Sequence, residues 1–418
     1  MKVLLLCDKF PPYQSGGAEI YVYRIAQKLK EYGNDVSIIS GGVVKKPCFR
    51  TMEEKFDGLQ VFRYNSCYPN LPLINMVKEI VDPVAIRHLR AILKKINPDI
   101  VHAHILQKGL SLFSLIAAKK LNFPTLLTVH DYWLICPKYF LLDQKNQICT
   151  KKMCFKCLRG KYIPFRNELM KYISKYVDVF ITPSQIMKVY LVQNGFPKNR
   201  ILAIHNGIEF DLETSDKNAQ KNFRRKYGIQ DDDKVILFLG RHKPYKGLDR
   251  LIRAAPYLKI DKFKILIVGH EVKGYDDFIR NLAEMLNIKS KVIFTGNISQ
   301  EDVWTAYQIS DVCAAPSLHP DNSPGVVYEA MWAGVPVLGT IFGGTPELVQ
   351  DGKTGFLIDP RNVREIRNKL EILLTDEELH KKMSIKAKKV VRQKFSMELH
   401  IQKLQNIYHH LISAAKNR

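Results

Sequence analysis

Short, almost wholly apolar runs alternate with helical patterns along the first half of the chain. The apolar runs predict strands at 3–7, 36–39, 59–64, 100–102, 125–129, 179–182 and 201–204. Between them, apolar residues spaced three and four apart predict helices at about 18–30, 85–96, 110–121, 168–176 and 185–193. Strands that are apolar on both faces are typical of a parallel sheet covered by helices on both sides.

The same pattern starts again after a polar stretch at 209–228. Strands are predicted at 234–240, 263–269, 292–295, 312–315 and 335–338, with helical segments between them. The chain has 418 residues, more than one hydrophobic core usually supports. We therefore expect two domains, 1–205 and 206–396. The last segment, 397–418, is predicted to be an amphipathic helix that packs either back on the first domain or on its own domain.

No apolar run approaches the roughly 18–20 residues that a membrane-spanning helix needs. The opening apolar run is short and Asp8 interrupts it, so we interpret it as a buried strand rather than a signal peptide. We expect a cytoplasmic protein. Its 64 Lys and Arg against 41 Asp and Glu give a net charge of +23, which attracts polyanions such as nucleotide phosphates, nucleic acid or an anionic membrane face.

Two cations follow the first strand of the second half. Arg241 comes directly after the terminal Gly240, and Lys246-Gly247 precedes a helical segment. In open parallel sheets, ligands bind beyond the carboxyl ends of the strands. Fixed cations beside a helix N-terminus suit a diphosphate. Two surface cations of a basic protein would look the same in isolation.

Two carboxylates follow a later strand. Asp321 lies in a polar loop after 312–315, and Glu329 lies in an otherwise apolar helix that starts near Gly325. A carboxylate that points inward from such a helix needs a partner. A ribose diol would satisfy it with two hydroxyl donors, whereas an exposed Glu would need none.

The order of motifs is specific. Gly-Arg…Lys-Gly is followed by Pro-Ser…Asp-x7-Glu-Ala-Met-x-Ala-Gly-x-Pro-Val, Gly-Gly-x-Pro-Glu and Asp-Gly-x-Thr-Gly-Phe-Leu. Gly16-Gly17-Ala18-Glu19, His130-Asp131 and His205-Asn206-Gly207 precede them. Across nearly the whole chain this resembles the family 4 glycosyltransferases. The resemblance implies the GT-B fold, an α/β fold of two Rossmann-like domains with parallel sheets facing a central cleft. It makes 1–205 the acceptor side and 206–396 the nucleotide-sugar-binding domain.

The resemblance also implies residue roles in the second domain. Arg241 and Lys246 would hold the donor diphosphate, and Glu329 would bind the ribose hydroxyls. Asp321 occupies a place, usually Glu, that contacts the transferred sugar, so its shorter side chain is a departure from the family pattern. The backbone amide at Gly325 would reach the sugar hydroxyls or the phosphate.

In the first domain, Gly16 and Gly17 lie between a strand and a helix, where glycine permits close approach to a phosphate or sugar. A tight turn alone would explain them equally well. The full Gly-x-Gly-x-x-Gly fingerprint is absent, which disfavours nicotinamide chemistry. By resemblance, His130 contacts the donor sugar and Asn206 belongs to the donor site.

The implied activity is retaining transfer of a sugar from a nucleotide-diphosphate sugar to a saccharide or lipid-linked acceptor, in cell-surface polysaccharide or glycolipid synthesis. No metal is needed if Arg241 and Lys246 stabilise the leaving diphosphate. The basic charge could hold the enzyme at the inner membrane face. One alternative is a nucleotide-sugar epimerase of the same fold. The other is a non-catalytic nucleic-acid-binding protein, which is not expected because the cations are spread along both halves.

Four cysteines cluster in an insertion at about 136–157: Cys136, Cys149, Cys154 and Cys157. The last two form a Cys-x2-Cys unit, and four thiolates in a cytosolic chain suggest a structural zinc site. An iron–sulfur cluster, a regulatory disulfide and four unrelated thiols stay open. Cys7 and Cys313 lie in apolar strands and are interpreted as small buried hydrophobic residues.

Overall fold

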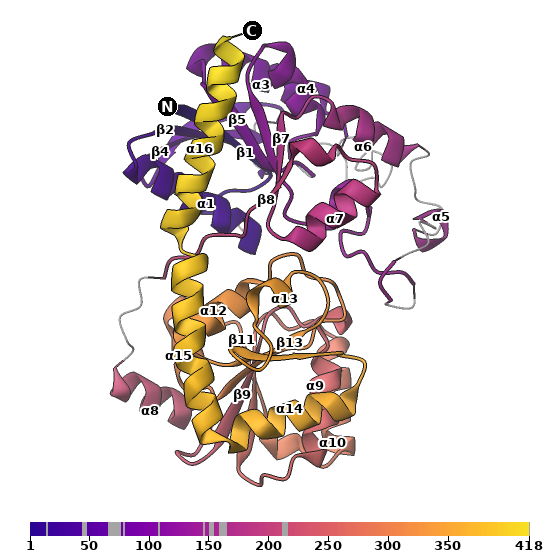
Figure 1. Ribbon diagram of the computed structural model, residues 1–418, viewed down its shortest axis with the longest axis vertical. Helices are drawn as coiled ribbons and strands as arrows, with labels where there is room; N and C mark the ends of the chain where they lie inside the picture. The colour runs from indigo at the N-terminus through magenta and orange to yellow at the C-terminus, as the bar shows by residue number, and fades with distance from the viewer. Residues whose placement is uncertain are drawn as a thin grey trace. The chain divides into compact units, whose positions relative to one another are not determined.

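The chain folds into two compact units. The computed structural model describes residues 1–13, 16–43, 48–65, 77, 80–107, 109–144, 147–149, 154–158, 165–210 and 216–417. The first unit comprises Met1–Tyr139, Lys151–Gly207 and Met397–Arg418, and the second comprises Phe140–Thr150 and Ile208–Ser396 (Figure 1). The chain thus enters the second unit after Gly207 and returns to the first at Met397. The insertion predicted at 136–157 is divided between the units.

The first unit is built on a sheet of eight strands within the described residues, in the order β3-β4-β2-β1-β5-β6-β7-β8. Every neighbouring pair is parallel except β3 and β4. Its strands are β1 (Lys2–Cys7), β2 (Asp35–Val43), β3 (Thr51–Phe56), β4 (Leu59–Asn65), β5 (Ile100–Ile105), β6 (Thr125–Thr128), β7 (Val179–Thr182) and β8 (Ile201–Ala203). Its helices are α1 (Gly17–Glu31), α3 (Pro83–Ile96), α4 (Phe113–Lys120), α5 (Cys154–Cys157), α6 (Arg166–Ser174), α7 (Gln185–Gln193) and α16 (Met397–Lys416), with short 3₁₀ turns η1 (Tyr132–Leu134) and η2 (Lys198–Arg200).

The antiparallel strand β3 is the main departure from the predicted elements of this unit. Its sequence, Thr-Met-Glu-Glu-Lys-Phe, contains three charged residues and shows no apolar run. Among the strands that the structure describes, it pairs only with β4, so it stands at the edge of the sheet. Charged residues are common on edge strands because they discourage pairing with other chains. A search for buried apolar runs therefore misses this strand.

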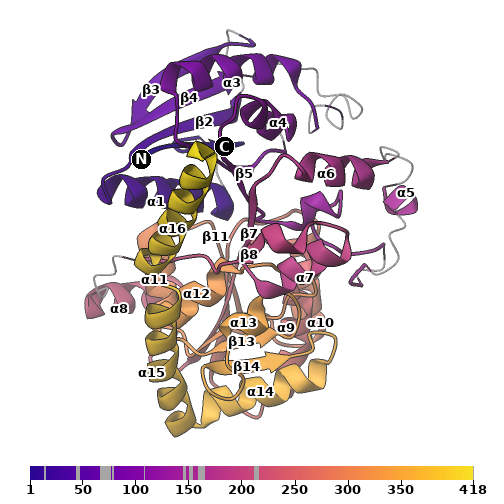
Figure 2. The same cartoon turned by 45° about the horizontal axis from the view of Figure 1, so that its top comes forward.

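Helix α16 packs on the first unit. It lies beside α1 in both views (Figure 1 and Figure 2), and the two helices are in contact. Leu404 and Tyr408 of α16 share one buried cluster with Ile25 of α1 and Leu5 of β1. Of the two packings that the sequence leaves open, the structure has the return to the first unit.

The second unit is built on a fully parallel sheet of six strands within the described residues, in the order β11-β10-β9-β12-β13-β14. The strands are β9 (Lys234–Leu239), β10 (Phe263–Val268), β11 (Val292–Gly296), β12 (Val312–Ala315), β13 (Val337–Thr340) and β14 (Gly355–Ile358). The helices are α8 (Lys217–Lys226), α9 (Leu248–Ala254), α10 (Tyr275–Met285), α11 (Gln300–Gln308), α12 (Gly325–Ala333), α13 (Thr345–Leu348), α14 (Val363–Thr375) and α15 (Glu377–Lys394), with 3₁₀ turns η3 (Pro244–Lys246), η4 (Ala255–Tyr257) and η5 (Lys289–Lys291). The predicted α/β architecture with parallel sheets is confirmed, and β14 is an addition to it.

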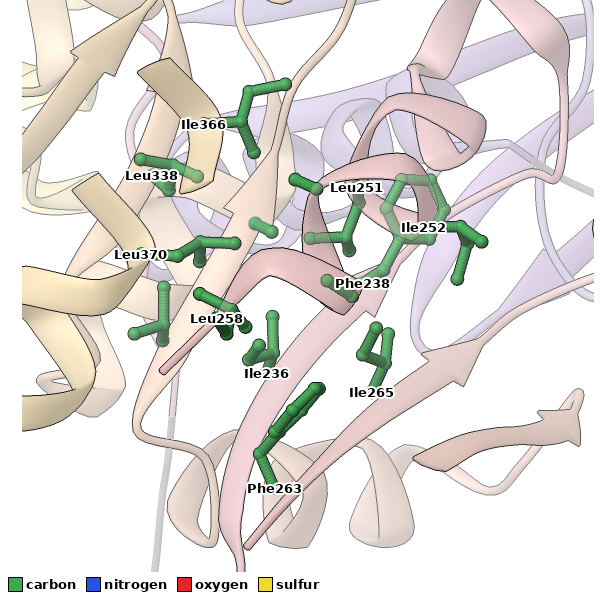
Figure 3. Packing of buried hydrophobic residues seen from close by; sticks show 14 of the residues in the cluster. Ile236, Phe238, Leu251, Ile252, Leu258, Phe263, Ile265, Leu338, Ile366 and Leu370 are labelled. Carbon is green, nitrogen blue, oxygen red and sulfur yellow. The ribbon is translucent and has the colours of Figure 1, made fainter. Parts of the chain in front are cut away.

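Helices cover both faces of this sheet with apolar side chains. Figure 3 shows one face, where Ile236 and Phe238 of β9 lie beside Leu251 of α9. Ile366 and Leu370 of α14 complete the same buried cluster. Burying one such side chain stabilises the fold by about 1.5–3 kcal/mol. This packing holds the strands in place and therefore fixes where the loops that follow them begin.

Each sheet has a point where the strand order reverses. In the second unit the chain runs from β9 outward to β10 and β11, then returns to place β12 on the other side of β9. In the first unit, β2 and β5 flank β1 in the same way. Ligands of open α/β sheets bind at such points, beyond the carboxyl ends of the strands. The loops after β9 and β12, and after β1 and β5, are therefore the places to look for a site.

The helices of the two units are moderate in length and carry many charged residues. Helix α16 spans 20 residues and α15 spans 18. None of the helices in the described part of the chain is long and apolar enough to cross a membrane.

Candidate active site

The loop after β9 places Lys246 beside the loop after β12. Strand β9 is followed by Arg241 and then by the 3₁₀ turn η3, which ends at Lys246. Gly247 follows with a φ of 77°, and a Cβ at this position would lie 1.9 Å from the carbonyl oxygen of Pro316. Only glycine permits this backbone conformation and this approach. The Lys-Gly pair seen in the sequence is thus what brings the two loops together.

Lys246 and Asp321 form an ion pair at this point. The Lys246 Nζ donates to Asp321 Oδ2 at 2.6 Å. Burial raises the pKa of Asp321, but the Lys246 ammonium, followed by His319 and hydrogen bonds from Lys246 and Ser323, outweighs it and lowers the pKa to about 2. Asp321 is therefore ionised at neutral pH, and its charge compensates one cation of the site.

Arg241 leaves a second positive charge at the same strand end. Its side chain is exposed, and it makes no hydrogen bond or ion pair within the described ranges. The pKa of the nearby His319 is lowered, first by burial and also by Lys246 and Arg241, although Asp321 opposes this. The site therefore combines a paired ammonium, an exposed guanidinium and a neutral imidazole. Such a place favours an anion.

Glu329 points from helix α12 toward a buried tyrosine. The Tyr307 hydroxyl donates to Glu329 Oε2 at 2.8 Å. Burial and then the Glu329 charge raise the pKa of Tyr307 well above its usual range. Glu329 is half-buried. A carboxylate can accept several hydrogen bonds, so this side chain suits a place that receives hydroxyl donors.

The N-terminus of α12 is open. Gly325 is its first residue and is exposed, and the preceding Pro324 provides no side-chain cap. The first backbone N–H groups of a helix have no partner inside the helix and attract negative charge. These groups follow the loop that carries Asp321.

An aromatic cluster that the sequence does not reveal adjoins the ion pair. Phe140 stacks on Tyr245 with ring centroids 4.6 Å apart, and both rings meet His319 edge-on, at 5.6 and 5.7 Å. His319 Nδ1 donates to the carbonyl of Phe140 at 2.8 Å. Tyr245 precedes Lys246, and His319 lies two residues before Asp321. His319 could have been found from its place after β12, but nothing local singles out Phe140.

In the first unit, His130 follows β6 and lies among other histidines. Its Nε2 is 3.0 Å from His104 Nδ1, and the ring of Tyr21 meets it edge-on at 5.7 Å. Burial, with a contribution from His400, lowers the pKa of His130 to about 3, so the imidazole is neutral at pH 7. His130 and His104 line a small cavity of about 20 Å³, room for about one water molecule.

The other predicted residues of the first unit lie in two segments. Gly16 and Gly17 are exposed at the start of α1, where Gly16 N donates to the Glu19 carboxylate at 2.9 Å. Asn206 is half-buried between His205 and Gly207. A Cβ on Gly207 would lie 2.5 Å from Cβ of His400 and 2.8 Å from Cα of Met397. Gly207 of the His-Asn-Gly motif therefore packs closely against the start of α16, which the sequence did not indicate.

The four clustered cysteines are all described, and none of them is in a disulfide. Cys136 is buried, whereas Cys149, Cys154 and Cys157 are half-buried. Among the described residues, no group of three or more His, Cys, Asp or Glu side chains is close enough to hold a metal ion. Cys149 belongs to the second unit and the other three cysteines belong to the first, so the four-thiolate zinc site stays a prediction. Cys7 and Cys313 are buried as expected, and burial raises the pKa of both thiols.

Two family models match the chain. "Glycosyltransferase Family 4" matches residues 15–212, and "Glycosyl transferases group 1" matches residues 219–390. The gap between the two matches, 213–218, falls within the polar stretch at 209–228, and only this gap and the two ends of the chain are unmatched.

Named relatives agree with these matches. An uncharacterized glycosyltransferase of Methanocaldococcus jannaschii is 27% identical over 420 residues, covering 98% of both chains. A lipopolysaccharide 1,2-N-acetylglucosaminetransferase of Salmonella typhimurium is 32% identical over 228 residues, covering 52% of this chain and 58% of that protein.

Solved structures share the architecture. A sucrose-phosphate synthase from Thermosynechococcus elongatus has a TM-score of 0.78 at 20% identity, covering 99% of each chain. HepE from Anabaena, in complex with UDP, has a TM-score of 0.73 at 19% identity, covering 98% of this chain and 100% of that one. The protein is therefore a glycosyltransferase with the GT-B fold. Within that class it belongs to the family 4 glycosyltransferases, as its motifs indicated.

Proposed function

We propose that the enzyme moves a sugar from a nucleotide-diphosphate sugar to a saccharide or lipid-linked acceptor, with retention of the anomeric configuration. The observation that carries the proposal is the Lys246–Asp321 contact beside the exposed Arg241, where the strand order of the second sheet reverses. Solved neighbours that hold UDP and UDP-glucose support a nucleotide-sugar donor.

Each part of this site has a task in that reaction. Arg241 and Lys246 bind the diphosphate, and Glu329 accepts hydrogen bonds from the ribose hydroxyls. Asp321 and the first amides of α12, at Gly325, contact the transferred sugar. His130, Gly16, Gly17 and Asn206 of the first unit keep their predicted roles toward the donor as part of the proposal.

The proposed transfer step breaks one bond at C1 of the sugar and forms another, and the cations of the site stabilise the leaving group. The bond from C1 of the sugar to the β-phosphate oxygen breaks, and the electron pair leaves with the nucleoside diphosphate. The acceptor hydroxyl oxygen then bonds to C1 on the same face, and its proton passes to the departing phosphate oxygen. Arg241 and Lys246 stabilise the charge that grows on that phosphate, which is an electrostatic role. In this proposal the chain's own cations stabilise the leaving diphosphate, and no metal takes part in the step.

The experiment that tests the proposal has two stages. Thermal stabilisation by UDP, GDP, ADP and CDP and by their sugars would identify the donor class, with loss of the shift expected in Glu329→Gln. The configuration at C1 of the first product, read by NMR, would then test retention. No shift with any nucleotide, or a product of inverted configuration, would contradict the proposal. Conversion of a nucleotide sugar without an acceptor would favour the epimerase.

The acceptor and location belong to the same proposal. Relatives named for lipopolysaccharide and for phosphatidylinositol mannoside synthesis support an acceptor in cell-surface polysaccharide or glycolipid synthesis. The net charge of +23 supports binding to an anionic membrane face. Flotation with vesicles of phosphatidylglycerol, compared with phosphatidylcholine, tests this. Equal recovery with both would remove the membrane from the proposal.

A further inference from the structure

A group of buried histidines and tyrosines lies between the first sheet and the helices α1 and α16. The proposed function uses only one of them, His130. The group comes from strand β5, the end of β6, helix α1 and helix α16, and its members are Tyr21, His102, His104, His130, His400 and Tyr408. Buried polar side chains are costly unless they are paired, so their arrangement calls for an explanation.

The first arm of this group runs from α16 through α1. His400 Nδ1 is 2.8 Å from the carbonyl oxygen of His205, so Nδ1 must carry the proton and donate. Burial lowers the pKa of His400 to about 4, which keeps the ring neutral and leaves Nε2 as an acceptor. The Tyr21 hydroxyl therefore donates to His400 Nε2, at 2.7 Å. The ring of Tyr21 in turn packs edge-on against His130.

The second arm runs from α16 through β5. The Tyr408 hydroxyl is 2.6 Å from His102 Nδ1, and Thr128 Oγ1 is 2.7 Å from His102 Nε2. Both ring nitrogens of His102 are thus engaged, which fixes its plane. The ring of His104 lies against this plane, with centroids 4.1 Å apart. His104 then reaches His130 directly.

The burial of the two rings decides which of His104 and His130 donates the hydrogen bond between them. Burial, followed by neighbouring histidines, lowers the pKa of both rings, so each carries a single N–H. His104 Nε2 is buried and has no hydrogen-bond partner in the described part of the chain. If His104 carried its proton there, a buried N–H would be left without an acceptor, which is the rarer case in proteins. The proton is therefore placed on His104 Nδ1, which donates to His130 Nε2, and His130 carries its own proton on Nδ1.

We propose that α16 positions His130: through His400–Tyr21 and through Tyr408–His102–His104 it holds the ring in one place and in the Nδ1–H tautomer. His104, Tyr21, His400 and Tyr408 are positioning residues in this scheme. The fixed tautomer matters because it decides which nitrogen can donate to a ligand. The inference rests on the proposed function only for why His130 needs positioning.

The tautomer can be measured without any substrate. Ring ¹⁵N NMR of the full chain, with His130 assigned from its loss in His130→Asn, should show at neutral pH a protonated Nδ1 and a bare Nε2. A protonated Nε2, or shifts averaged between the two forms, would overturn the inference.

Two matched pairs of variants test the arms. His104→Leu removes the donor to His130 and should give averaged or reversed ¹⁵N shifts, whereas His104→Asn keeps an N–H donor and should preserve them. Tyr408→Phe should broaden the His130 signals. Tyr64→Phe removes a hydroxyl from another buried tyrosine of the same unit and should leave them unchanged. If Tyr408→Phe does not fold, Tyr21→Phe tests the first arm. Unchanged signals in His104→Leu, or in both tyrosine variants, would overturn the positioning role.

Turnover separates this inference from the proposed function. His104→Leu should lower kcat about 10- to 100-fold while the KM for the donor stays the same, because a displaced group costs rate more than binding. Altered ¹⁵N shifts with normal turnover would leave the positioning intact and contradict the proposed contact of His130 with the donor. Normal ¹⁵N shifts with lost turnover would contradict the positioning instead.

Discussion

Lys246 and Asp321, 75 positions apart in the chain, meet at 2.6 Å where the second sheet reverses its strand order. In this state the carboxylate neutralises the ammonium that is assigned to the donor diphosphate. In the proposed reaction the donor diphosphate takes over the ammonium and Asp321 turns to a sugar hydroxyl. The proposal thus makes the ion pair a balance of charge that lasts until the donor binds.

The first prediction concerns Lys246. Lys246→Met should lower kcat/KM at least about 100-fold, because a cation that stabilises the leaving diphosphate is lost. Circular dichroism should show an intact fold. The control is Lys226→Met, which removes the lysine of an exposed ion pair with Asp302. Equal turnover in the two variants would contradict the assignment of Lys246.

The second prediction concerns the length and charge of residue 321. Asp321→Asn keeps the shape but removes the charge, and it should lower kcat by about 100-fold if the ionised carboxylate is what contacts the sugar. Asp321→Glu restores the residue usual in the family and should retain most of the turnover. Kinetics with saturating donor distinguishes the two. A fully active Asp321→Asn would show that the charge serves only to pair with Lys246.

The third prediction concerns Glu329. Glu329→Gln should weaken binding of the nucleoside diphosphate by about 1.5–3 kcal/mol, the usual worth of hydrogen bonds to a charged group. Isothermal titration calorimetry measures it directly. Tyr307→Phe removes the hydroxyl that donates to the carboxylate but keeps the carboxylate itself, and it should have a smaller effect on binding. Glu378→Gln, on the exposed start of α15, serves as the control with no effect.

The fourth prediction concerns the stacked rings of Phe140 and Tyr245. A double-mutant cycle with Phe140→Leu and Tyr245→Leu should give a coupling of about 0.5–1.5 kcal/mol in the free energy of unfolding. Urea denaturation followed by fluorescence provides the values. The same cycle with Phe140→Leu and Tyr257→Leu, an exposed ring, should be additive to within about 0.5 kcal/mol. Additivity in the first cycle would mean that the 140–149 segment is not held by this contact.

The fifth prediction concerns pH. Burial is the largest cause of a lowered pKa in His102, His104, His130, His319 and His400. These side chains protonate near pH 6.5 in the unfolded chain, which then binds more protons than the native state below that pH. The free energy of unfolding should stay level from about pH 8 to 7 and fall from about pH 6.5 to 5, by up to about 1.4 kcal/mol per histidine and pH unit.

Urea midpoints across this pH range test the sign and the source. His104→Asn removes one buried imidazole, so the free energy of unfolding should fall less steeply below pH 6.5, by up to about 1.4 kcal/mol per pH unit. His410→Gln, at an exposed position, should leave this slope unchanged. Stability that rises toward acid pH would mean that the buried rings are charged in the native state.

Much of the fold could be predicted because strands that are buried on both faces of a parallel sheet have nearly continuous apolar sequences. Strands β7 and β12 and helix α7 have the predicted bounds, and most other elements differ from the prediction by only a few residues. Strand β3 was not predicted, because its charged residues lie at the edge of the sheet and form no apolar run. The candidate site, which stays a prediction, is best marked in the sequence of the second unit, where Arg241, Lys246, Asp321 and Glu329 lie in the segments that follow β9 and β12.

The rest of the site depends on contacts that have no local signal. Phe140 reaches Tyr245 from more than a hundred positions away, and Tyr408 reaches His102 from an even greater separation. Such partners are chosen by the tertiary packing, not by the residues beside them. The cysteine spacing predicts a zinc site, and that site stays a prediction because the four cysteines are divided between the two units.

The return of α16 to the first unit also bears on how the protein is made. The ribosome synthesises α16, the helix that covers part of the first sheet, only after the whole second unit up to Ser396. Until then, the apolar face that will receive Leu404 and Tyr408 is open to chaperones. A chain cut short before α16 would expose this face permanently. Cellular quality control could thus recognise truncated copies before they bind any sugar nucleotide.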